Sequence, residues 1–302
     1  MIKNKYKFID LFAGIGGFHL ALHNLGAECV FASEMDVHAR KTYEENFKNI
    51  SPSLFDNDNF NSDITNIEKE EVNNKIPSFD ILCGGFPCQP FSQAGFKKGF
   101  DDERGNLFFY IAQIIAIKKP KAYFLENVRH LLKHDDGKTF SVIKSILQEL
   151  GYSFYFKVIK ASDFGLPQLR PRVFIVGFKN DIKNEFNFPE PIILQKTMSD
   201  IWGGECSREI GFTLRVGGRS SPIDDRRNWD GYWVDGEVKR LSPKEGKAMQ
   251  GFPSDFSFPV TKAQAMKQLG NSVAVPAVQA IANTVIEYSN LLEECQNGIE
   301  RK

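Results

Sequence analysis

A cysteine stands in a turn rich in glycine and proline that directly follows an apolar run. Residues 84 to 92 read GGFPCQPFS, and the run before them, residues 79 to 83, is typical of a strand. In open α/β folds, ligands bind outside the carboxyl ends of the strands, so a thiol in this turn can meet a substrate. A lone free cysteine is otherwise most often a small buried hydrophobe, and Cys88 by itself does not decide between the two roles.

A second glycine-rich turn follows the first predicted strand, residues 6 to 11. Residues 10 to 18 read DLFAGIGGF and open a predicted helix from Gly16 to Leu25, so backbone amides face whatever binds there. Glu34 follows a predicted strand over residues 28 to 33, where an acid can bind ribose hydroxyls. Because His19 takes the place of the third glycine in the dinucleotide pattern, the turn indicates a nucleoside cofactor without a pyrophosphate. A plain tight turn with a surface acid remains the alternative.

Charged residues follow two further apolar runs. Glu126 comes directly after Tyr123-Phe124-Leu125 and is therefore expected at the same sheet edge as Cys88. Arg170 and Arg172 stand one residue apart in QLRPR, at the start of another predicted strand. Taken alone, the glutamate could be a surface residue, and the arginines could be ordinary charges on an edge strand.

Strand-like and helical runs alternate through the first 177 residues. Beyond the strands already given, apolar runs at 122 to 125 and 172 to 177 and helical patterns at about 106 to 118 and 139 to 150 predict an α/β fold with a mostly parallel sheet. Residues 178 to 239 are rich in glycine, proline, tryptophan and arginine, with short β-like pieces such as 212 to 216 and 232 to 234, and predict a smaller, loop-rich domain.

Helical signals return after residue 239. They are a capping box at Ser242 and Glu245, a second start at Thr261 with Gln264, and a last helix over about 276 to 290 that is expected to pack on the sheet. The predicted division is therefore 1 to 177 plus 240 to 302 for the large domain and 178 to 239 for the small one.

Composition limits the class of protein. The 302 residues are 42% hydrophobic and 25% charged, which is typical of a folded globular protein. Five irregularly spaced cysteines favour neither a disulfide framework nor a metal site, and we expect reduced thiols and no metal. Without an apolar run of ~18 residues or a cleavable leader, we expect a cytoplasmic protein with no membrane contact.

Charge gives no global support for binding a polyanion. The 38 basic and 38 acidic residues cancel, so any such site must be local. Residues 151 to 180 carry five basic side chains against the single acid Asp163, which is either a binding face or an ordinary solvated one.

In this order, the segments resemble the cytosine carbon-5 DNA methyltransferases. The resemblance covers nearly the whole chain and rests on DLFAGIGGF, Glu34, Ser62-Asp63-Ile64, GFPCQPFS, RGNLFF at 104 to 109, ENV at 126 to 128, QLRPR at 168 to 172, RLSPKEGKAMQGFP at 240 to 253, and GNSVAVPA at 270 to 277. It implies a Rossmann-like fold of the S-adenosylmethionine-dependent methyltransferases, with residues 178 to 239 as a target-recognition domain.

The resemblance also implies the reaction, in which a cytosine is flipped out of a specific short duplex site and methylated at carbon 5 by S-adenosyl-L-methionine. Carbon 5 attacks a methyl donor only weakly, so a nucleophile, here Cys88, must first add at carbon 6 and turn the ring into an enamine. Glu126 would hold or protonate the ring nitrogen beside the exocyclic amine. Arg172 would bind the base carbonyl, and Arg170 would orient neighbours or phosphate.

The remaining site residues follow from the same resemblance. Cofactor binding is expected from Phe12, Gly14, Gly16, Glu34, Met35, Asp63, Ile64, Asn271 and Ser272. Met35 is a departure, because many members have a tryptophan there, stacked on the adenine. DNA binding is expected from Gln89, Ser92, Thr213, Arg215, Arg219, Arg226 and Arg227. Guanidinium forks suit guanine edges, although Asp224 and Asp225 could instead neutralise the last two arginines.

Three other functions compete with this one. A tRNA cytosine-5 methyltransferase of the same family would share the catalytic residues, but the insert rich in arginine and glycine favours double-stranded DNA. A nicotinamide oxidoreductase shares the α/β class but leaves Cys88 without a role. A catalytically inactive binding module is disfavoured because Cys88, Glu126 and both arginines are present. A monomer is expected, as is a cognate restriction endonuclease that acts on the same site without a stable complex.

Overall fold

The computed structural model describes residues 6–87, 107–218 and 220–299. Four of the predicted site residues, Cys88, Gln89, Ser92 and Arg219, lie outside these ranges.

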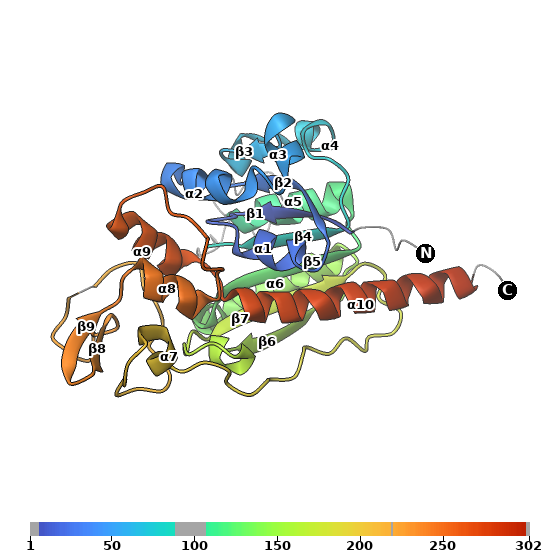
Figure 1. Ribbon diagram of the computed structural model, residues 1–302. Helices are drawn as coiled ribbons and strands as arrows, with labels where there is room; N and C mark the ends of the chain where they lie inside the picture. Colours follow the sequence, from blue (N-terminus) through green and yellow to red (C-terminus); the bar gives the residue numbers. More distant parts are fainter. Residues whose placement is uncertain (1–5, 88–106, 219, 300–302) are drawn as a thin grey trace.

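A seven-stranded sheet forms the centre of the molecule, with strand order β3-β2-β1-β4-β5-β7-β6 (Figure 1). The parallel strands are β1 (Lys7–Leu11), β2 (Glu28–Ser33), β3 (Phe60–Asn61), β4 (Ile81–Gly85) and β5 (Ala122–Val128). The strand β7 (Arg172–Phe178) lies antiparallel between β5 and β6 (Tyr155–Ile159). The predicted α/β class with a mostly parallel sheet is confirmed.

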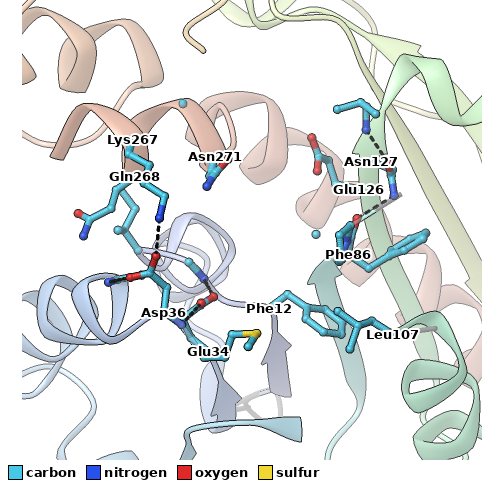
Figure 2. Close-up of a pocket in the computed structure, with 18 of the residues that line it drawn as sticks. Phe12, Glu34, Asp36, Phe86, Leu107, Glu126, Asn127, Lys267, Gln268 and Asn271 are labelled. Atoms are coloured by element: carbon cyan, nitrogen blue, oxygen red, sulfur yellow. Dashed lines mark hydrogen bonds and ion pairs between the residues drawn. The ribbon is translucent and has the colours of Figure 1, made fainter. Parts of the chain in front are cut away.

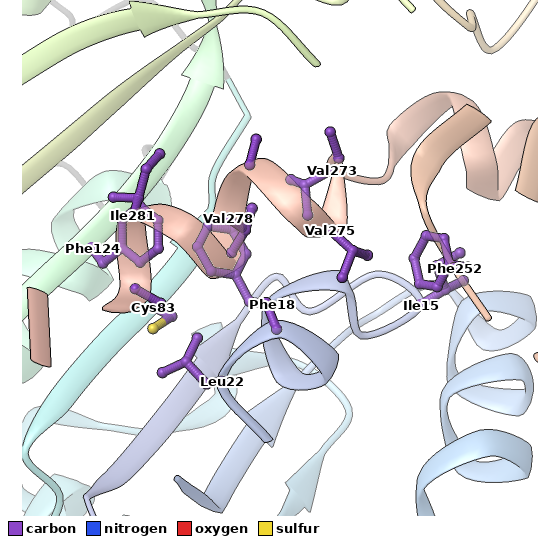
Figure 3. Packing of buried hydrophobic residues seen from close by; sticks show 14 of the residues in the cluster. Ile15, Phe18, Leu22, Cys83, Phe124, Phe252, Val273, Val275, Val278 and Ile281 are labelled. Carbon is purple, nitrogen blue, oxygen red and sulfur yellow. The ribbon is translucent and has the colours of Figure 1, made fainter. Parts of the chain in front are cut away.

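Helices cover both faces of the sheet, which explains why its central strands are continuous apolar runs. The helices of the sheet region are α1 (Gly17–His23), α2 (Val37–Phe47), α3 (Pro52–Asp56), α4 (Val72–Lys75), α5 (Leu107–Lys118), α6 (Lys138–Glu149) and α10 (Val275–Ile299). On one face, Phe18 of α1 packs with Cys83, Phe124 and Ile281 of α10 (Figure 3). The last helix therefore packs on the sheet as expected, although it is longer than the predicted 276 to 290.

Two strands run further than predicted, and both corrections bring residues to the site. The strand β4 starts at Ile81 and continues through both glycines to Gly85, and β5 continues through Glu126 to Val128. A Cβ on Gly84 would lie 2.7 Å from the carbonyl oxygen of Leu11, so glycine is needed where β4 and β1 approach closely. The predicted end of β4 was wrong because glycine usually interrupts strands, whereas here close packing requires it. The predicted end of β5 was wrong because Glu126 to Val128, although partly polar, pair with β7.

The chain leaves the sheet after β7. The short helix α7 (Met198–Trp202) and the hairpin of β8 (Gly231–Val234) and β9 (Glu237–Arg240) lie at one end of the molecule, next to α8 (Pro243–Gln250) and α9 (Lys262–Asn271) (Figure 1). The capping box of Ser242 and Glu245 is confirmed, and Thr261 caps α9 as predicted. The predicted β-like piece at 212 to 216 is wrong, since these residues form no strand. The expected boundary after residue 239 falls inside β9.

Among the described residues, one helical stretch, Lys262–Gln296, which spans α9 and most of α10, is long and apolar enough to cross a membrane, with a mean hydropathy of 1.3 in its most apolar window. In the structure, 61% of that window is buried inside the protein. A core helix passes the same test of length and composition, so this stretch gives only weak evidence of a membrane span.

Candidate active site

A pocket of about 380 Å³ opens at the carboxyl ends of β1, β2, β4 and β5 (Figure 2). This is the edge at which open α/β sheets bind ligands. Its lining brings together eight of the predicted site residues: Phe12, Gly14, Glu34, Met35, Glu126, Arg170, Arg172 and Asn271. Pro87, the residue before Cys88, also lines it. The pocket therefore combines groups predicted to bind a cofactor with groups predicted to act on a base.

The first turn has a backbone that only some residues adopt. Gly14 and Gly16 have φ of +57° and +84°, and Phe12 has φ of +56°, which is an outlier for an aromatic residue. A Cβ on Gly16 would lie 2.2 Å from the Phe47 ring of α2, so α2 packs tightly against the turn. The surrounding structure thus fixes a strained turn at the pocket wall, as is common at ligand sites.

Glu34 holds this turn from the end of β2. Its Oε2 accepts a hydrogen bond from the backbone N–H of Gly14, and its Oε1 accepts one from that of Asp36, both at 2.8 Å. Burial raises the pKa of Glu34, and the two backbone donors oppose that shift. A carboxylate has about four acceptor positions, so the backbone N–H groups leave some of them available to hydroxyl groups of a ligand.

Three polar lining residues near Glu34, namely Asp36, Lys267 and Gln268, were not predicted. Asp36 caps α2 through the N–H groups of His38 and Ala39, and Lys267 of α9 lies 3.0 Å from its Oδ2 (Figure 2). Gln268 also lines the pocket, and its Oε1 accepts a hydrogen bond from Thr42. The sequence shows that Asp36 can cap the helix that follows it. No local pattern indicates that Lys267 and Gln268 of α9 reach a pocket whose first residues lie more than 200 positions earlier in the sequence.

Glu126 and Arg172 form an ion pair on the other side of the pocket. Glu126 Oε1 lies 2.9 Å from Arg172 Nε, and the glutamate is only 8% exposed. The pair forms between β5 and β7, which are antiparallel neighbours in the sheet. Burial raises the pKa of Glu126, and the positive charges of Arg172 and Arg170 oppose that rise. A buried carboxyl with a raised pKa keeps its proton to higher pH and can serve as an acid.

Asn127 fixes the chain that leads to Cys88. Its side-chain Nδ2 donates to the carbonyl oxygen of Phe86 at 2.8 Å, and its Oδ1 accepts from the N–H of Val128 (Figure 2). The asparagine is 2% exposed. Strand β5 therefore holds the last described residues before Cys88 next to Glu126.

Arg170 is a buried clamp and does not reach solvent. Only 2% exposed, it donates to the carbonyl oxygens of Leu214 at 3.3 Å and Gly270 at 3.0 Å, and to that of Ser272. A phosphate contact, the expected alternative, does not fit this burial, since both Nη atoms donate to the backbone and the unpaired Nε is buried as well. Its other expected role, orienting neighbours, agrees with the geometry.

Four predicted cofactor residues do not line the pocket: Gly16, Asp63, Ile64 and Ser272. Asp63 caps a short 3-10 helix, Ile64–Asn66, by accepting from Thr65, and Ile64 is 3% exposed. Asp63 and Ile64 shape the loop beside β3, and the part of all four residues in cofactor binding stays a prediction.

The predicted DNA-binding residues of the described chain lie on the loops between α7 and β8. Leu214 is buried, and its N–H donates to Gln168 Oε1 at 3.0 Å, which leaves Thr213 partly exposed and Arg215 exposed beside it. A Cβ on Gly270 would lie 2.6 Å from the backbone of Arg215, so this loop lies at the rim of the pocket that Gly270 lines. Farther along, Arg226 is exposed, and Arg227 pairs with Asp225 at 2.7 Å, so Asp225 does neutralise that arginine.

Comparison with known proteins agrees with this geometry. The family model for C-5 cytosine-specific DNA methylase matches residues 6–211 and 205–287. The Type II methyltransferase M.SsoII of Shigella sonnei is 45% identical over 93% of this chain and 80% of its own, and M.HhaI of Haemophilus parahaemolyticus is 37% identical over 92% and 94%. Among solved structures, the Dnmt2 methyltransferase of S. pombe has a TM-score of 0.72 at 19% identity, over 95% of this chain and 100% of that one.

The chain therefore belongs to the C-5 cytosine-specific DNA methylases. It is an enzyme, a DNA (cytosine-5-)-methyltransferase whose relatives are methyltransferases of restriction-modification systems. The function implied by the sequence is thus confirmed, and the alternative of a tRNA methyltransferase is less supported.

Proposed function

We propose that the pocket holds S-adenosyl-L-methionine and a flipped cytosine side by side, with the division of roles predicted from the sequence. The observation that carries this proposal is that Glu34 and Glu126, the two acids predicted for these roles, line one pocket of about 380 Å³. Pro87 lines the same pocket, so the chain enters the segment of Cys88 at this point.

The residues at the Glu34 end suit the nucleoside of this cofactor. Glu34 is held by two backbone amides and has acceptor positions left for ribose hydroxyls. Met35 is 67% exposed and lines the pocket, so its thioether can lie against an adenine ring in place of the tryptophan expected there. Asn271 lines the same pocket from α9. When bound, the cofactor supplies an electrophilic methyl group to the base.

The residues at the Glu126 end suit the cytosine. The Cys88 thiolate adds at carbon 6 while Glu126 protonates the ring nitrogen, and Arg172, which is ion-paired with Glu126, binds the base carbonyl. Carbon 5 of the resulting enamine would take the methyl group, and the sulfonium sulfur would keep the electron pair of the broken bond as a thioether. Loss of the carbon-5 proton, return of the ring-nitrogen proton to Glu126 and release of the Cys88 thiolate would then give 5-methylcytosine. Arg170 orients its neighbours through the backbone contacts described above.

The test is trapping of the covalent adduct. The methylated site is first mapped by bisulfite sequencing of DNA from cells that express the protein. A duplex with 5-fluorocytosine at the target position should then form a stable protein–DNA adduct, because fluorine cannot leave as the proton does. Cys88→Ala should form no adduct and transfer no methyl group, yet bind S-adenosylmethionine normally. Glu126→Gln should lower the rate of methyl transfer by about 10² to 10⁴-fold. Turnover by Cys88→Ala would contradict the proposal.

We also propose the roles of the two domains, the oligomeric state, the localisation and the partner that the family resemblance implies. Residues 178 to 239 read the DNA, residues 1 to 177 plus 240 to 302 carry the chemistry, and the end of β9 extends the smaller unit to Arg240. The protein acts as a monomer in the cytoplasm, on double-stranded DNA. A cognate restriction endonuclease acts on the same site without a stable complex.

A further inference from the structure

Two loop segments at the rim of the pocket are attached to a pair of charged residues, the buried Asp230 and the partly exposed Arg240. We call residues 215–218 and 220–221 the rim loop. Asp230 is 0% exposed and accepts hydrogen bonds from the N–H of Ser220 at 3.2 and 3.3 Å. Arg240, at the end of β9, lies 3.0 Å from Asp230 and donates to the carbonyl oxygen of Ser221 at 2.8 Å.

Trp229 holds the rim loop at a second place. This side chain is 1% exposed, and its Nε1 donates to the carbonyl oxygen of Gly217 at 2.9 Å. Three neighbouring carbonyl and amide groups of the rim loop are thus bound by three side chains that come from β9 and the segment before β8. Asp230 is fully buried, whereas Ser220, whose N–H it binds, is exposed.

The backbone of the rim loop requires this support. Gly218 has φ of +76°, and Ser220 has φ of +68°, a left-handed conformation that a serine adopts only at a cost. Strained residues persist where the surrounding contacts determine them, and the bond from Ser220 to Asp230 is such a contact.

The rim loop borders the pocket that we propose to receive the flipped base. Its first residue, Arg215, packs its backbone against Gly270 of the pocket wall, and its side chains are largely exposed, with Val216 48% exposed. A Cβ on Gly217 would meet nothing within 4 Å, so this part of the backbone is open to close approach by another molecule.

We infer that Asp230 and Arg240 are positioning residues for sequence recognition, which set the rim loop in its DNA-reading shape before the duplex binds. A loop already in its bound shape loses less conformational entropy on binding, and it presents its groups to one set of base edges only. The inference rests on the proposed role of residues 178 to 239 in reading DNA.

The experiment measures discrimination between DNA sites. For each variant, kcat/KM for methyl transfer is measured on the mapped site and on duplexes with one changed base pair, and cofactor Kd is measured by calorimetry. Arg240→Met should lower the ratio of kcat/KM on the mapped site to kcat/KM on the changed duplexes at least tenfold. It should leave cofactor Kd unchanged. Arg240→Lys should restore part of the ratio, because it keeps the charge beside Asp230.

Two further variants keep the test decisive. Asp230→Asn combined with Arg240→Met leaves no unpaired buried charge, should unfold cooperatively near the wild-type temperature, and should also lose discrimination. The matched control is Lys239→Met, which removes the same charge one residue earlier on β9. In the described part of the chain, Lys239 forms an ion pair with Asp235, which is exposed. This control variant should keep the wild-type ratio.

Each contrary result has a distinct meaning. Wild-type discrimination in Arg240→Met and in the double variant would overturn the inference alone. An equal loss in Lys239→Met would overturn it as well, because charge rather than loop shape would then explain the effect. A wild-type protein that methylates all cytosines alike would overturn the inference together with the proposed reading of DNA by residues 178 to 239.

Discussion

Replacement of Glu34 by alanine tests the cofactor end of the pocket most directly. The change removes the carboxylate that accepts hydrogen bonds from the N–H groups of Gly14 and Asp36. It also removes the group that we propose to bind the ribose hydroxyls. Both effects lower cofactor affinity, the first by loosening the strained turn and the second by loss of direct contacts.

The magnitude follows from the kind of bond that is lost. A hydrogen bond to a charged group contributes ~1.5 to 3 kcal/mol, so loss of one such bond to the ribose weakens binding by about tenfold to about 150-fold. Burial raises the pKa of Glu34, which means that the charged form is partly desolvated and that its bonds are not fully replaced by water. We therefore expect a change in the upper part of that range.

The assay is calorimetric titration with S-adenosylmethionine and with S-adenosylhomocysteine. Because the ribose is common to both, Kd should rise by the same factor for the two ligands. The control is Glu44→Ala, which removes the same charge from an exposed position on α2, where Glu44 pairs with Lys48 at 3.0 Å. An affinity of Glu34→Ala within twofold of the wild type, or a change for S-adenosylmethionine alone, would refute the ribose assignment.

Three other predictions follow from the geometry. Asp10 is fully buried, and burial raises its pKa well above the ordinary 3.8, so the folded protein keeps a proton that the unfolded chain has lost. The free energy of unfolding should therefore fall by ~1.4 kcal/mol per pH unit as pH rises from that ordinary value to the raised one, and Asp10→Asn should remove this slope in urea titrations at several pH values. An unchanged slope would contradict it. Arg170→Met leaves three buried carbonyl groups without their donor, at ~1 to 3 kcal/mol each, and should destabilise the protein by at least ~3 kcal/mol in urea unfolding; a loss below ~1 kcal/mol would show that the clamp is dispensable. Arg215→Ala should lower discrimination between the cognate duplex and single-base variants by ~1 to 3 kcal/mol without a change in cofactor Kd, whereas a uniform loss with a shallower salt dependence would indicate a phosphate contact instead.

The sequence by itself determined the features that depend on local conformation. The turn around Gly14 and Gly16 was readable because positive φ favours glycine, and β1 and β2 were readable as short apolar runs bounded by turn signals. The capping box at Ser242 was readable because its two hydrogen bonds join residues three apart. The ordered set of motifs then implied the family, and with it the reaction.

Only the tertiary structure decided which groups meet. The pairing of Glu126 with Arg172 depends on β7 lying antiparallel to β5, and the contact of Asp36 with Lys267 joins residues 231 positions apart. No local pattern encodes such contacts, because they depend on how whole elements pack. The same reason explains where other motif residues lie. Asp63 and Ile64 belong to the predicted motif but do not line the pocket, and their role in cofactor binding stays a prediction. Arg170 lies in the motif of Arg172, but its side chain donates to the backbone carbonyls of distant segments.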